Sequence, residues 1–153
     1  MLSYSQQIAN NEDMPQQLIL YGKLLREFET VRAMVELYCR QQHRSTLSPC
    51  KFGPCTSGPC ADCAALLEYA KLRLDRCPYG EAKPTCNRCP IHCYKPEPKL
   101  QMQVIMRYAG PRMLLHHPIL AIRHLLHERA PLPEKPEAGS SNRSRRLSQT
   151  KRK

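Results

Sequence analysis

Apolar residues recur at three- and four-residue steps along most of the chain, which is the period of an α-helix. The helical runs cover the chain from Pro15 to about residue 43, and then about residues 62–77, 97–109 and 112–129. No segment shows the sustained apolar–polar alternation of a β-strand. We therefore expect an all-α fold, a small helical domain over residues 15–130.

Proline and glycine mark where these helices should end. Residues 45–59 and 78–96 are rich in proline and cysteine and are expected to be loops. Gly110 and Pro111 predict the end of the third helix, and Pro118 predicts a kink or split of the fourth near His117, because an interior proline removes a helical hydrogen bond.

The last segment, residues 131–153, differs from the rest in composition. It contains seven lysines and arginines against two glutamates, a net charge of +5 within a chain total of +11. Proline, serine and basic residues of this kind predict a disordered basic tail. Such a tail could bind nucleic acid, although a solvated tail needs no partner to explain it.

The beginning of the chain bears on its compartment. Residues 1–20 lack a basic stretch followed by an apolar one, so we expect no secretory signal. No apolar run approaches the roughly 18 residues of a membrane helix. We expect a cytoplasmic protein without a membrane partner, whose nine cysteines are reduced and serve metal or redox chemistry.

Two Cys-x-x-Cys pairs stand out among these cysteines: Cys60 with Cys63, and Cys86 with Cys89. Their spacing is typical of one four-cysteine zinc site. However, Cys63 and Cys77 fall fourteen residues apart on one predicted helix, about 21 Å at 1.5 Å per residue. The alternative is therefore a separate group of ligands at each end of that helix.

At the later end of this helix, four thiols lie within seventeen residues. The favoured metal ligands are these four, Cys77, Cys86, Cys89 and Cys93. Their spacing suits an iron–sulfur cluster, and four thiolates serve zinc equally well. Spacing alone does not separate the two.

At the earlier end, two ligand pairs flank one loop. Cys39 and His43 share a helix face, and they could meet Cys60 and Cys63 if the helices fold antiparallel. The result would be a Cys3His zinc site. Alternatively, Cys39 and Cys77 are core residues, since free cysteine is often buried. We expect Cys50 and Cys55 to be exposed thiols, and the histidines of residues 116–127 to be half-exposed polar residues.

No phosphate loop, GxSxG or HExxH motif is present. The favoured function is accordingly a non-enzymatic, cysteine-rich metalloprotein. The alternatives are a nucleic-acid-binding regulator with structural zinc, and a thiol oxidoreductase that uses a Cys-x-x-Cys pair.

Several longer motifs together resemble a known family. They are Cys39 preceded by Glu-Leu-Tyr, then CADCAALLEYAKLRLDRCPYG, CNRCPIHCYKPE and MRYAGPRMLLHHPILAIRHLL. Over about residues 29–129 the chain resembles the nitrous oxide-stimulated promoter (YgbA-like) family of bacterial proteins. This resemblance implies a link to nitrosative stress and to iron handling. The family name describes the response of a promoter and does not imply that the protein binds DNA.

Overall fold

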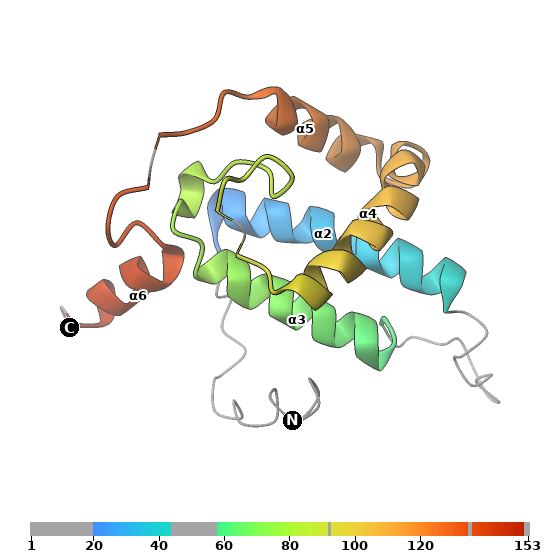
Figure 1. The fold of residues 1–153 in the computed structure, drawn as a ribbon, viewed down its shortest axis with the longest axis horizontal. Coiled ribbons are helices and arrows are strands. Elements are labelled where there is room, and N and C mark those ends of the chain that lie inside the picture. Colours follow the sequence, from blue (N-terminus) through green and yellow to red (C-terminus); the bar gives the residue numbers. More distant parts are fainter. Residues whose placement is uncertain (1–19, 44–57, 92, 135, 152–153) are drawn as a thin grey trace.

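The computed structural model describes residues 20–43, 58–91, 93–134 and 136–151, and this part of the chain is helical without a strand (Figure 1). The elements are α2 (Gly22–Gln42), α3 (Ala61–Asp75), the short 3-10 helix η2 (Gly80–Ala82), α4 (Pro96–His116), α5 (Pro118–Arg129) and α6 (Asn142–Thr150). The all-α fold expected from the sequence is confirmed for the described residues.

Helix α2 is the centre of the fold. Both α3 and α4 pack against it, and α5 packs against α4 (Figure 1). Val35 and Leu37 of α2, Ala70 of α3 and Ala109 of α4 are fully buried in the core that these three helices share. Fully burying a side chain of the size of valine or leucine contributes roughly 1.5–3 kcal/mol, so this shared core fixes how the helices are placed.

The start of α2 is held by a residue that is distant in sequence. Gly22 has a φ of 55°, a left-handed conformation that glycine adopts readily. The backbone N–H of Lys23 donates a hydrogen bond of 2.9 Å to the Glu81 carboxylate, which thereby satisfies one of the free N–H groups at this helix end. This contact ties the segment after α3 to the beginning of α2. The predicted residues 15–19 of this helix lie outside the described residues.

The expected end of the third helix at Gly110 and Pro111 is wrong. Helix α4 continues through Pro111 to His116. Pro111 leaves the carbonyl of Arg107 without its helical donor, but Ala109 and Met113 on either side of it are fully or almost fully buried. The packing of this face offsets the lost hydrogen bond. The predicted split near His117 is confirmed, because α5 begins at Pro118.

The structure also differs from the expected disorder of residues 131–153. Helix α6 lies in this segment, with Ser141 as its N-cap, whose hydroxyl accepts a hydrogen bond from the Ser144 N–H. Asn142 and Arg146 both donate to the carboxylate of buried Asp75, at 2.6 Å each. Composition predicted a solvated tail, whereas this buried carboxylate attaches the tail to the end of α3.

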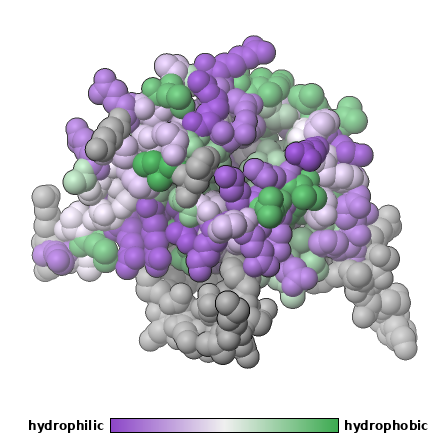
Figure 2. Space-filling model, in the orientation of Figure 1, coloured by the Kyte–Doolittle hydropathy of each residue, from purple (hydrophilic) through white to green (hydrophobic). Residues whose placement is uncertain are grey.

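Exposed apolar side chains gather near the junction of α4 and α5, along one edge of the face in Figure 2. They are Leu114, Leu115, Ile119, Ile122, Leu125 and Leu126. None of the described helices combines the length and the apolar character that crossing a membrane requires.

Candidate metal centre

Thiols gather at both ends of α3, which is unbroken over its fifteen residues. Cys60 and Cys63 lie at its beginning, and Cys77 follows its end. The helix separates these ends by roughly 20 Å at 1.5 Å per residue. A single zinc site made from both Cys-x-x-Cys pairs is therefore not formed, and the structure has a separate group of ligands at each end.

The first group combines the end of α2 with the beginning of α3. We call it the Cys3His cluster, and its members are Cys39, His43, Cys60 and Cys63. Their ligand atoms all lie within 4.8 Å of one another. Among the described residues, no other group of three or more Cys, His, Asp or Glu side chains converges closely enough to hold an ion.

The contacts within the cluster show how the two helices bring it together. The Nδ1 atom of His43 lies 3.3 Å from the Sγ of Cys60 and 3.5 Å from the Sγ of Cys63. The backbone N–H of Cys60 donates to the Sγ of Cys39 at 3.2 Å. Two sulfurs on one tetrahedral zinc ion lie about 3.8 Å apart, because each zinc–sulfur bond is about 2.3 Å long. The ligand atoms of the cluster, which all lie within 4.8 Å and in places approach to 3.3 Å, are close to this spacing. The Cys3His cluster therefore has the dimensions to hold a metal ion.

Burial and hydrogen bonds shift the pKa values of these thiols in different directions. Burial raises the pKa of Cys39 and that of Cys63. Burial acts in the same direction on Cys60, but hydrogen bonds from Cys63, Cys39 and His43 outweigh it and lower the pKa of Cys60 to about 7. Without a metal, only one of the three thiols ionises readily, and an ion that binds here has to displace the protons of the others.

Aromatic side chains cover the histidine of the cluster. The ring of Tyr38 packs edge-on against that of His43, with 5.4 Å between centroids, and against that of Tyr108 at 5.5 Å. The hydroxyl of Tyr108 donates to Gln41 at 2.8 Å. These contacts restrict the orientation of the imidazole, as the surroundings of metal-bound histidines commonly do.

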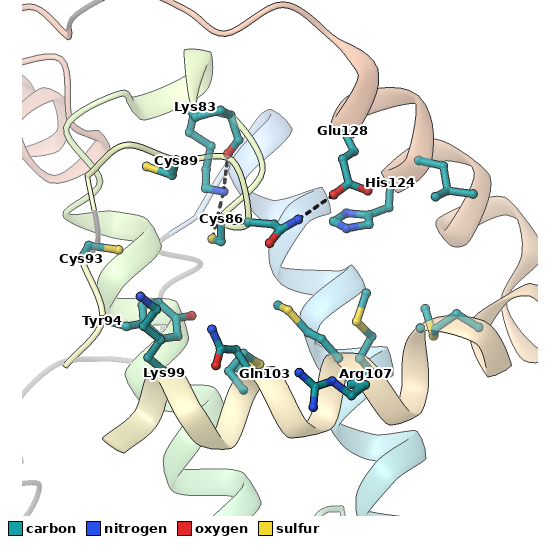
Figure 3. Close-up of a pocket in the computed structure, with 18 of the residues that line it drawn as sticks. Lys83, Cys86, Cys89, Cys93, Tyr94, Lys99, Gln103, Arg107, His124 and Glu128 are labelled. Carbon is teal, nitrogen blue, oxygen red and sulfur yellow. Dashed lines mark hydrogen bonds between the residues drawn. The ribbon is translucent and has the colours of Figure 1, made fainter. Parts of the chain in front are cut away.

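The second group follows α3. We call Cys77, Cys86, Cys89 and Cys93 the loop thiols. They line a cavity of about 760 Å³ between the loop and helices α4 and α5 (Figure 3). The set favoured from spacing therefore surrounds an open space, whereas the less favoured Cys3His set converges.

Burial raises the pKa of two of the loop thiols, and the other thiols near them act in the same direction. Burial and the neighbouring loop thiols together raise the pKa of Cys93 to about 11. Burial likewise raises the pKa of Cys77. Thiolates that lie close together repel one another, so a positive charge beside them favours their ionised form.

A buried lysine supplies such a charge, and the sequence provided no signal for it. Lys83 is only 4% exposed, and its Nζ donates to the Pro84 carbonyl at 3.0 Å and to the Cys86 Sγ at 3.5 Å. Burial would lower its pKa, but the charges of Cys86, Glu27 and Cys77 outweigh burial and raise it. Lys83 therefore carries a positive charge beside the loop thiols.

The histidines of α5 fall into two kinds. His127 contacts Glu27 at 2.8 Å and the Lys83 carbonyl at 3.1 Å, so it has a structural role. His124 lines the cavity, and its buried Nδ1 has no hydrogen-bond partner among the described residues. Both are half-exposed, as expected, but their positions in the sequence did not reveal the cavity beside one or the Glu27 contact of the other. Cys50 and Cys55 lie outside the described residues.

Comparison with known proteins gives a consistent result. The model of the family described as "Nitrous oxide-stimulated promoter" matches residues 22–137, which include the Cys3His cluster and the loop thiols. The chain is 42% identical over 115 residues to the uncharacterized protein YgbA of Escherichia coli (strain K12), and the match covers 75% of this chain and 89% of that protein. No solved structure matches. The chain belongs to the nitrous oxide-stimulated promoter family.

Proposed function

We propose that this protein is a non-enzymatic metalloprotein of the nitrosative-stress response, and that its Cys3His cluster binds one zinc ion. The observation that carries the proposal is the convergence of three thiols and one imidazole within 4.8 Å. These ligands come from two helices that a loop separates in the sequence, and zinc favours this donor set in four-coordinate structural sites.

The geometry supports a single ion in preference to a cluster at this position. In a cubane iron–sulfur cluster each cysteine binds a different iron atom, so the thiolates lie farther apart than two thiolates on one ion. The His43 and Cys60 ligand atoms, 3.3 Å apart, suit a shared ion instead. The protein supplies all four ligands, which is typical of a structural zinc site without an open position for a substrate.

The link to nitrosative stress rests on the family and on the chemistry of thiolates. Nitric oxide attacks thiolate-bound zinc and iron, so a Cys3His ion is a reasonable target. Cys60 and His43 are only half-buried, which gives a small molecule access to the metal–sulfur bonds. Loss of the ion would release the end of α2 from the beginning of α3 and change the conformation of the protein.

The test is to purify the protein without oxygen and to measure zinc per chain. We expect Cys39→Ala combined with Cys60→Ala to remove one zinc ion per chain, and Cys86→Ala combined with Cys89→Ala to leave that ion in place. Because the first variant could fail to fold, the wild type is also reconstituted with cobalt. Cobalt absorption typical of three thiolates and one imidazole is expected, and unchanged zinc in the first variant would contradict the proposal.

A thiol oxidoreductase is the second candidate, because one observation favours it. Cys60 occupies the N-cap position of α3, its pKa is lowered to about 7, and buried Cys63 follows three residues later. Reactive Cys-x-x-Cys pairs have this arrangement. Catalysed reduction of a disulfide substrate that Cys60→Ser abolishes would support this candidate. Zinc that stays bound at equal strength in the presence of thiol reductants supports the metalloprotein.

A further inference from the structure

We propose a second, separate centre, an iron–sulfur cluster that the four loop thiols bind in the cavity facing α4, with Lys83 as its buried counter-charge. This inference is independent of the zinc ion at the Cys3His cluster. Zinc per chain reports on that site, and iron and sulfide per chain report on the loop. Either centre can fail its test without affecting the other.

The first step of the argument is the placement of the thiols. Cys77 follows α3, and Cys86, Cys89 and Cys93 border the same cavity from the loop (Figure 3). The unbroken helix α3 lies between them and the Cys3His cluster. The two centres therefore share no ligand.

The second step is the size of the space. The loop thiols do not converge as the Cys3His cluster does, and instead line a cavity of about 760 Å³. Four thiolates around a space of this kind suit a cofactor with several metal atoms, in which each thiolate binds a different metal atom. A single zinc ion would need all four sulfurs about 3.8 Å from one another.

The third step is charge. A cubane cluster with four thiolate ligands carries a net negative charge, which is costly to bury without compensation. Lys83 is buried beside Cys86 at 3.5 Å, and its hydrogen-bond partners among the described residues include no carboxylate. Glu27 is the carboxylate whose charge influences Lys83, and it already contacts His127. An anionic cluster at the loop thiols would pair with this ammonium group.

The fourth step is the wall opposite the thiols. Every methionine of the described residues lines the cavity, and these are Met34, Met102, Met106 and Met113. With Tyr94 they supply apolar, polarizable contacts on a wall that also carries Lys99, Gln103 and Arg107. The buried Nδ1 of His124 belongs to a residue that lines the same cavity, has no hydrogen-bond partner within the described part of the chain, and could donate a hydrogen bond to a cluster sulfide. The surroundings of a cluster set its stability and its reduction potential.

The experiment begins with purification without oxygen and reconstitution with ferrous iron and sulfide. We expect a brown protein with broad visible absorption, and with iron and labile sulfide in equal amounts. Cys86→Ser combined with Cys89→Ser should lose most of both while retaining zinc. The matched control, Cys39→Ser combined with Cys60→Ser, should lose zinc while retaining iron and sulfide.

Lys83 is tested as a positioning residue by the reduction potential of the reconstituted cluster. Lys83→Met removes a positive charge and should make the potential more negative, whereas Lys83→Arg should restore it. Lys99→Met, on the α4 side of the cavity, is the comparison for a lysine that lines the cavity without a hydrogen bond to Cys86 among the described contacts. A colourless protein with two zinc ions per chain, or one whose loop thiols bind no iron, would overturn the proposal. A cluster reduction potential that Lys83→Met leaves unchanged would overturn the role of Lys83 in the proposal.

Discussion

The imidazole Nδ1 of His43 lies 3.3 Å from the thiol of Cys60, although seventeen residues separate them in the sequence. The contact joins the residue that follows α2 to the residue that precedes α3. It exists because these two helices pack against each other with the end of one beside the beginning of the other. Zinc binding at this contact and the fold of the protein are therefore expected to depend on each other.

The first prediction concerns the nitrogen ligand. His43→Ala removes one of four ligands and should weaken zinc binding by more than about tenfold, because losing even an outer-shell partner has an effect of this size. His43→Cys provides a thiolate and should retain the ion. Competition with a coloured chelator measures both affinities. Equal affinity of His43→Ala and the wild type would exclude His43 as a ligand.

The second prediction concerns stability. Removing zinc with a chelator should lower the thermal midpoint, since the ion binds the folded state alone. At a free zinc concentration one hundred times the dissociation constant, the ion adds about 2.7 kcal/mol to the free energy of unfolding. Thermal unfolding with and without chelator measures this. The Cys39→Ala and Cys60→Ala double variant should not respond to the chelator.

The third prediction concerns the attachment of α6. Asp75→Asn should weaken the hydrogen bonds that the Asp75 carboxylate accepts from Arg146 and Asn142, with a loss of about 2 kcal/mol in the free energy of unfolding. Amide hydrogen exchange in α6 should become faster. Arg145→Met, which alters an exposed residue of the same helix, is the matched control and should leave this exchange unchanged.

The fourth prediction concerns the proline inside α4. Pro111→Ala would restore an N–H donor for the Arg107 carbonyl and should raise the free energy of unfolding by about 1 kcal/mol or more. Urea unfolding measures the change. Pro118→Ala is the comparison, because a proline in the first turn of α5 breaks no helical hydrogen bond and its removal should have a smaller effect. A destabilised Pro111→Ala would show that the proline ring itself contributes to packing.

Local features of the sequence were enough to predict helices α2 to α5, apart from the end of α4, and the separation of the thiols. Apolar periodicity predicted α2 to α5, because the buried positions of an amphipathic helix recur every three to four residues. The spacing of fourteen positions from Cys63 to Cys77 on one helix excluded a shared site, because the rise of a helix is constant. Pro118 likewise marked the beginning of α5, since proline acts on its own neighbours.

Only the tertiary structure decided which thiols converge, because convergence depends on contacts between residues distant in sequence. Spacing favoured the loop thiols, but the packing of α2 against α3 brings Cys39 and His43 to Cys60 and Cys63. Contacts between residues distant in sequence also decide three other features: the burial of Lys83, the attachment of α6 to Asp75 and the continuation of α4. Each depends on the burial of a partner from another part of the chain, which no local pattern of residues encodes.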